Sequence, residues 1–230
     1  MRYAIVSYVG HSLLLNAFKI LIDFDFIEPL ITSLKGFITY DLQTAIDMLQ
    51  MINKALSSIL KKISEDELVR WVGFSDEGKT IEEIIIEKGL DVEDLNITLV
   101  YLSQVPNFVK SAKALSLYFV TKGIPTKTVE IRAKISDLDE RARALIKTIS
   151  TIIKDQLARE REVILVSAGS PEPEKTILKL ISLAYGLEIY DLVDGKLFKM
   201  VFKGIEFDKE FFKENMEILG KLIEPIPAEE

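Results

Sequence analysis

Residues 2–12 read Arg-Tyr-Ala-Ile-Val-Ser-Tyr-Val-Gly-His-Ser, a cluster of β-branched and aromatic residues that ends at a glycine and two polar residues. Such a run is typical of a buried strand followed by a tight turn. Helical spacing then continues from Ser12 to about Ile22. The chain is therefore expected to open with a strand, a short polar loop and a helix.

The same order recurs along the chain. Further strands are expected at 96–102, 127–133, 162–167 and 187–192, with helices at 106–122, 137–159 and 173–185. The alternation predicts an α/β fold: a Rossmann-like, mostly parallel sheet with helices on both faces. The pair Asp194-Gly195 is a hairpin signal, so an antiparallel edge strand is expected over 196–203, before a last helix over 208–222.

The segment 37–92 does not follow the alternation and is rich in helical patterns. We interpret it as a helical insertion after the first strand and helix. No linker rich in Pro, Gly or Ser divides the chain, so one domain is expected over 1–230, with 193–230 as its C-terminal hairpin and helix. In the helix over 137–159, four isoleucines are expected to form the apolar face: Ile146, Ile149, Ile152 and Ile153.

The composition limits the possible functions. The chain has no cysteine and one histidine, which argues against a disulfide, a thiolate nucleophile or a zinc site, and no metal or cofactor is expected. The net charge of −7 argues against binding of long nucleic acid. No apolar stretch is long enough for a membrane span and no secretory signal is recognisable, so a cytoplasmic protein is expected.

The ligand site is expected at two loops. In an open parallel sheet, ligands bind beyond the carboxyl ends of the strands, where the strand order reverses. The first and fourth strands are the natural neighbours there, and their loops run into helix N-termini, which favour an anion. The candidate binding residues are Val9, Gly10, Asn16, Ser167, Ala168, Gly169, Ser170 and Pro171. Neither loop is a phosphate-binding Walker A loop or a full dinucleotide fingerprint.

The residues of the first loop suggest a family. Residues 7–16, Ser-Tyr-Val-Gly-His-Ser-Leu-Leu-Leu-Asn, resemble the "S-T-V-G-T-S-L-L-T-N" opening of CRISPR-associated Rossmann-fold (CARF) proteins, the cyclic oligoadenylate sensors of type III antiviral defence. The segment 137–190 resembles that family's second half in its order of elements. The resemblance implies a homodimer whose paired loops bind cyclic tetra- or hexa-adenylate. It also implies a ring nuclease, because the Arg-x4-6-His motif of the family's RNase effectors is absent.

Three residues are candidates for catalysis without metal, by attack of a ribose 2′ hydroxyl on the adjacent phosphorus. Ser12 matches the family serine and would bind phosphate, or it caps its own helix. His11 replaces the family's threonine and would transfer a proton, or it is an inert loop residue. Glu172 stands where the family's lysine is expected, and Lys175 would substitute for that lysine or point to solvent.

Two alternatives remain open. One is a non-catalytic sensor that binds the ring and signals to a partner, which the Glu172 departure favours. The other is an unrelated Rossmann-like nucleotide-binding protein. Five aromatic residues are candidates for adenine stacking, with core or dimer packing as the simpler role: Trp71, Phe74, Tyr101, Tyr118 and Phe119.

Overall fold

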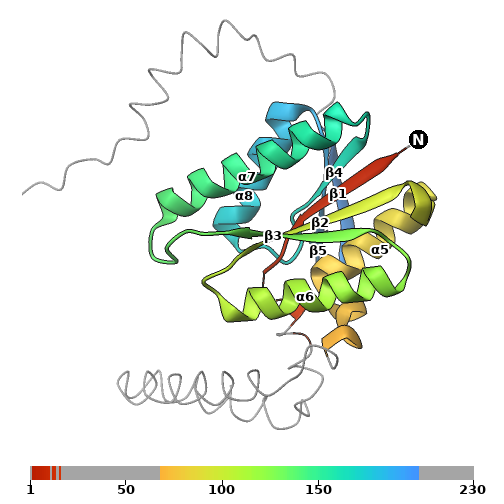
Figure 1. Ribbon diagram of the computed structural model, residues 1–230, viewed down its shortest axis with the longest axis horizontal. Helices are drawn as coiled ribbons and strands as arrows, with labels where there is room; N and C mark the ends of the chain where they lie inside the picture. Colours follow the sequence, from red (N-terminus) through yellow and green to blue (C-terminus); the bar gives the residue numbers. More distant parts are fainter. Residues whose placement is uncertain (1, 11, 14–15, 17–67, 202–230) are drawn as a thin grey trace, which may run out of the picture.

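A computed structural model describes residues 2–10, 12, 13, 16 and 68–201 (Figure 1). The strands are β1 (Tyr3–Tyr8), β2 (Leu95–Leu102), β3 (Thr126–Ile131), β4 (Glu162–Val166), β5 (Glu188–Val193) and β6 (Lys196–Val201). The helices are α5 (Asp76–Lys88), α6 (Pro106–Thr121), α7 (Leu138–Ala158) and α8 (Glu172–Tyr185), with 3-10 turns η1 (Val72–Phe74) and η2 (Val92–Asp94).

Within this part of the chain, six strands form one sheet in the order β3-β2-β1-β4-β5-β6. All neighbouring pairs are parallel except β5 and β6, which form the expected hairpin at Asp194-Gly195. The predicted Rossmann-like α/β fold is confirmed. The strand order reverses at β1, which lies between β2 and β4, so the switch point falls where the sequence predicted it.

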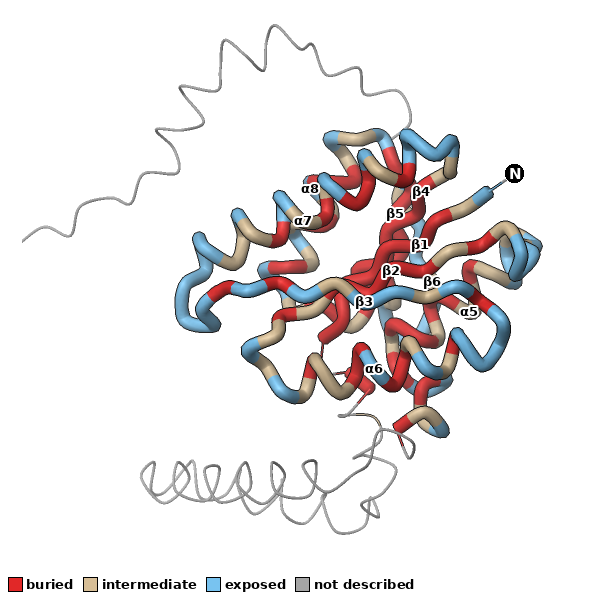
Figure 2. Tube along the Cα trace, in the orientation of Figure 1, coloured by how far each residue is buried: buried red, intermediate tan, exposed pale blue. Residues whose placement is uncertain are grey.

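Helices cover both faces of the sheet (Figures 1 and 2). Helices α5 and α6 lie on one face, and α7 and α8 lie on the other. Strand β1 contributes to both layers, because Ile5 packs into the cluster with α5 and α6 while Ala4 and Val6 pack into the cluster with α7 and α8. This explains why the central strands are apolar on both sides.

Local sequence fixes where several helices begin and end. The Ser75 hydroxyl accepts a hydrogen bond from the Gly78 amide at the start of α5, and the Asp137 side chain caps α7 in the same way. Helix α5 ends at Gly89 and α8 at Gly186, both in the left-handed conformation with φ of 59° and 65°.

One expectation for α7 is wrong. Ile149, Ile152 and Ile153 are buried as predicted, but Ile146 is 46% exposed and Leu145 is buried in its place. The apolar face is therefore centred one position earlier along its first half, because Leu145 and Ile149 lie one turn apart on the same face.

Part of the predicted helical insertion lies outside the described residues, namely 37–67, as does the last helix expected at 208–222. The remainder, 68–92, contains η1 and α5 and runs into η2. Among the described helices, none combines the length and the apolar character that a membrane crossing requires.

Candidate functional site

The loops that follow β1 and β4 lie against each other. The strands pair with Ser7 opposite Val166, so Gly10 and Gly169 leave the sheet at the same level. A Cβ atom on Gly10 would lie 2.1 Å from the carbonyl oxygen of Gly169, closer than any side chain allows. The absence of a side chain at Gly10 thus permits backbone-to-backbone contact of the two loops, which the sequence placed together.

A third segment also enters this contact, which the sequence did not predict. The carboxylate of Glu77, in the first turn of α5, lies between the loops and is fully buried. The Gly10 amide donates a 2.9 Å hydrogen bond to Oε1, and the Ser12 hydroxyl donates to Oε2. A Cβ on Gly169 would lie 2.2 Å from the Glu77 carboxyl carbon. We call the surroundings of this carboxylate, formed by Gly10, Ser12 and Gly169, the carboxylate cradle.

The start of α5 is held against the first loop by further hydrogen bonds. The Asp76 amide donates to the Ser12 hydroxyl oxygen at 3.1 Å. The Asn16 side-chain amide donates to the Phe74 carbonyl at 2.7 Å and lies 3.4 Å from the Asp76 carboxylate. The Ser12 hydroxyl is therefore bound to the first turn of α5, and Asn16 holds the chain before α5.

The electrostatic state of Glu77 follows from its position. Burial raises its pKa from 4.5 to about 7, and the neighbouring Asp76 raises it further, while the hydrogen bonds from Ser12 and Gly10 lower it. The carboxyl group therefore changes charge near neutral pH, inside the contact between the two loops.

The second loop is fixed to its neighbours on both sides. The Ser167 amide donates to the Tyr190 carbonyl of β5 at 2.9 Å, and its hydroxyl lies 3.3 Å from the same oxygen. The Ser170 amide donates to the Ser167 carbonyl at 3.2 Å, which closes a turn around Gly169 at φ 74°. The Ser170 hydroxyl lies 3.5 Å from the Tyr8 carbonyl, at the outer limit of a hydrogen bond.

The predicted binding residues differ in what they offer to a ligand. Val9 and Ala168 are buried in the apolar cluster and support the loops from within. Ser12 and Ser170 are also buried, at 6% and 8% exposure. The half-buried members of the set, which solvent reaches, are Asn16, Gly169 and Pro171.

Lys175 points toward the sheet instead of solvent. Its side chain is 16% exposed, and Nζ lies 3.3 Å from Oδ1 of Asp191, a buried residue of β5. The exposed Glu172 lies 3.7 Å from the same Nζ, and Lys179 lies 3.4 Å from the other Asp191 oxygen. Asp191 therefore holds the Lys175 ammonium beside the second loop, although Glu172 occupies the position at which the family's lysine was expected.

Another buried acidic group, Glu174, lies on the face of the sheet opposite to Glu77. Glu174 of α8 is 4% exposed, and its Oε1 lies 3.5 Å from Nε of Arg141 in α7. Burial raises the pKa of Tyr8, at the end of β1, and the charge of Glu174 raises it further. The Tyr8 phenol therefore stays neutral. The pair of Arg141 and Glu174 joins α7 to α8.

The aromatic residues divide as the simpler prediction stated, with one exception. Phe119 is fully buried, and Trp71, Tyr101 and Tyr118 pack partly buried against the core. Phe74 is 57% exposed and leans on Trp71, with 5.9 Å between ring centroids. Asn16 binds the Phe74 carbonyl, so the backbone of Phe74 lies against the residue that closes the family-like segment 7–16.

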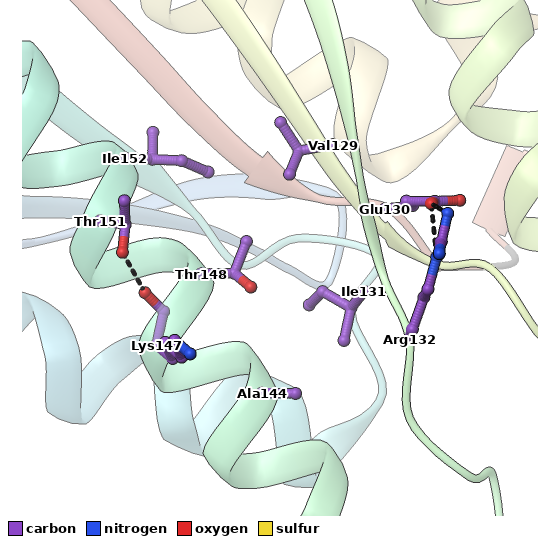
Figure 3. Close-up of a pocket in the computed structure, with 9 residues that line it drawn as sticks. All are labelled: Val129, Glu130, Ile131, Arg132, Ala144, Lys147, Thr148, Thr151 and Ile152. Carbon is purple, nitrogen blue, oxygen red and sulfur yellow. Dashed lines mark hydrogen bonds and ion pairs between the residues drawn. The ribbon is translucent and has the colours of Figure 1, made fainter.

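A separate groove of about 460 Å³ lies between the edge strand β3 and α7 (Figure 3). Val129 and Ile131 face Ile152 across it, while Glu130 and Arg132 point away and pair with each other. None of its lining residues belongs to the two loops. It is therefore distinct from the predicted site.

Two further points complete the site. His11 lies outside the described residues, so its predicted role stays a prediction. Over the described ranges, no three or more His, Asp or Glu side chains are grouped as a metal ion would need.

Comparisons with known proteins assign no family. No protein-family model matches the chain, and no curated protein matches its sequence. A solved structure, protein VC1899 from Vibrio cholerae, aligns with 16% identity and a TM-score of 0.38, covering 47% of this chain and 27% of that one. The chain thus spans about a quarter of that protein's length. No function follows from a likeness at this level.

Proposed function

We propose that the chain binds cyclic oligoadenylate, of four or six adenosines, in a cleft between two copies, and opens the ring to linear products without metal. Such a protein would act as an off-switch of CRISPR antiviral signalling in the cytoplasm. The observation that carries the proposal is the contact between Gly10 and Gly169, which joins the two loops on which the family resemblance rests.

The loop arrangement suits a cyclic phosphate ligand. The ring carries repeated phosphates and its symmetry matches that of a homodimer, in which each copy supplies the same pair of loops. Asn16, Gly169 and Pro171 line the solvent-facing side of this pair. Asn16 binds the backbone of Phe74, and the exposed Phe74 ring is the candidate for base stacking, because an aromatic face stacks unpaired bases irrespective of sequence.

Ring opening requires two contributions from the protein. It must hold the 2′ hydroxyl in line with the phosphorus and the 5′ oxygen that leaves, and it must stabilise the charge on the phosphate oxygens. In this proposal the 2′ oxygen bonds to phosphorus as the bond to the 5′ oxygen breaks, with the proton passing from the former to the latter. Lys175, oriented by Asp191 at 3.3 Å, supplies the positive charge. Ser12 positions the phosphate, and His11 transfers the proton.

A second candidate function is binding without cleavage, as a sensor that signals to a partner. Lys175 already interacts with Asp191 and Glu172, and a paired lysine gives less stabilisation to a phosphate than a free one. This observation favours the sensor.

One experiment separates the two functions. Labelled cyclic tetra-adenylate and cyclic hexa-adenylate are incubated with the protein in the presence of a metal chelator. Binding is then followed by gel shift, and the products are analysed separately. We expect a shifted band and linear products. A shift without linear product would leave the sensor, and no shift with either ring would contradict both functions.

The role of His11 has its own test. His11→Ala should slow single-turnover opening of the ring, because proton transfer contributes about 10²–10⁴-fold where it is needed. An unchanged single-turnover rate would rule out this role.

A further inference from the structure

The carboxylate cradle has the composition of an oxyanion site. It offers the Gly10 amide and the Ser12 hydroxyl as donors, each bound to one oxygen of the same carboxylate. Amide and hydroxyl donors at short range are what proteins use to bind phosphate and carboxylate groups. Here both donors are already used, and the group that uses them belongs to the chain itself.

The shape of the cradle depends on the position of that carboxylate. A Cβ on Gly169 would lie within 2.6 Å of the carboxyl carbon and both carboxylate oxygens of Glu77. Glu77 is fully buried and accepts a hydrogen bond from Gly10, 67 residues away in the sequence, although acidic residues of a first helical turn are ordinarily solvated. The Glu77 carboxylate is therefore held in place by hydrogen bonds from the first loop, and α5 by itself does not require this position.

We propose that the carboxylate cradle is an oxyanion site occupied from within by Glu77, and that a phosphate or carboxylate group of a ligand binds there by displacing the Glu77 carboxylate. For a phosphate of cyclic oligoadenylate, the inference rests on the proposed function. The claim that the cradle binds an oxyanion does not rest on the proposed function, and formate and inorganic phosphate test that claim by themselves.

Displacement would have a structural consequence. The start of α5 is bound to the first loop through the bonds of Ser12 to Glu77 and Asp76, and through that of Asn16 to Phe74. An anion that takes the Ser12 hydroxyl removes at least one of these bonds. Ligand binding at the loops is thereby coupled to the position of the first turn of α5.

The first test uses formate, the smallest carboxylate. Glu77→Ala empties the cradle, and formate should then raise the melting temperature by about 2–4 °C relative to sodium chloride at equal ionic strength, as expected for about a fivefold excess over Kd. Wild type should not respond. Glu83→Ala is the matched control, because Glu83 is on the same helix but pairs with Lys79 at the surface.

Outcomes on either side decide the proposal. A rise confined to Glu77→Ala supports it, and so does recovery of the fold in formate if Glu77→Ala is unfolded in chloride. An equal rise in the melting temperature of Glu83→Ala or wild type would overturn it. So would a Glu77→Ala variant that formate neither stabilises when it is folded nor refolds when it is unfolded.

A second variant avoids any loss of folding. Glu77→Gln keeps the side-chain shape and removes the charge, so inorganic phosphate should displace it more easily and raise its melting temperature more than that of wild type. An equal response would count against displacement. With cyclic tetra- or hexa-adenylate, Glu77→Gln should bind at least about fivefold more tightly than wild type. If neither protein binds either ring, the proposed function fails while the formate and phosphate results still decide the nature of the cradle.

Discussion

The amide nitrogen of Gly10 lies 2.9 Å from Oε1 of Glu77, and this hydrogen bond joins residues 67 positions apart in the chain. It brings the start of α5 into the contact between the loops after β1 and β4. The candidate site is therefore built from three segments. Two supply backbone and hydroxyl groups, and the third supplies a buried acid.

The first prediction concerns how stability depends on pH. The folded state raises the pKa of Glu77 from 4.5 to about 7, so between these values the folded chain binds more protons than the unfolded one. The free energy of unfolding should then fall as pH rises through this window, by on the order of 3 kcal/mol from this group. Below about pH 4.5 and above about pH 7, the contribution should level off.

Denaturant unfolding of wild type and Glu77→Gln between pH 4 and 8 measures this effect. The difference between the two proteins isolates Glu77 from opposing groups such as Glu188, whose pKa is lowered by Lys88 and Lys199 although its burial acts to raise it. Parallel pH profiles for the two proteins would show that Glu77 does not titrate in this window.

The second prediction concerns the close approach at Gly169. Gly169→Ala should cost more than about 3 kcal/mol of stability, because it adds a clash with Glu77 to the strain of φ 74°. Gly123→Ala is the matched control, since Gly123 has φ 81° and open space around it, and about 1 kcal/mol is expected there.

Chemical denaturation of the single and double variants checks the cause. If the clash with Glu77 dominates, adding Glu77→Ala to Gly169→Ala should cost less than the sum of the two separate effects. Additive costs, or equal costs for Gly169→Ala and Gly123→Ala, would show that the contact is not limiting.

The third prediction concerns base stacking. Phe74→Ala should weaken binding of the cyclic ring by about 5- to 150-fold, corresponding to about 1–3 kcal/mol per stacked base. Phe198→Ala removes a ring of similar exposure on the edge strand β6, which is separated from β4 by β5, and should leave the affinity unchanged. Equilibrium binding of both variants provides the comparison, and equal affinities would exclude Phe74 as a stacking residue.

The fourth prediction concerns the cation beside the second loop. Lys175→Ala should slow ring opening by about 10²–10³-fold, the usual cost of one group that stabilises transition-state charge. Lys179→Ala removes the second lysine that pairs with Asp191, with its Nζ 3.4 Å from Oδ2, and should change the rate only slightly. Single-turnover rates of the two variants distinguish them, and similar losses would assign the effect to Asp191 and the loop instead of Lys175.

Much of this arrangement could be predicted from the sequence, for a physical reason. The pattern of apolar runs and helical segments fixes a parallel sheet, and the carboxyl ends of parallel strands share one edge. The sequence alone therefore places the loops at Gly10 and Gly169 together. Ile146 shows the limit of the same reasoning, since a position on the margin of an apolar face is buried or exposed by small rotations of the helix.

Glu77 could not be predicted in the same way. An acidic residue just after a Ser cap is the common pattern of a first helical turn, where it interacts with the helix dipole in solvent. Its burial depends on contacts with loops far away in sequence, which no local pattern encodes. The pairing of Lys175 with Asp191 is hidden for the same reason, because it depends on how α8 lies over β5.

The central claim is that two copies of the loops bind one cyclic oligoadenylate, and titration calorimetry with cyclic tetra-adenylate and cyclic hexa-adenylate tests it most directly. One of the two rings should bind with a stoichiometry of one ring per two chains, and linear adenylate of the same length should bind much more weakly. Absence of binding by both rings, or one ring bound per chain, would contradict the claim.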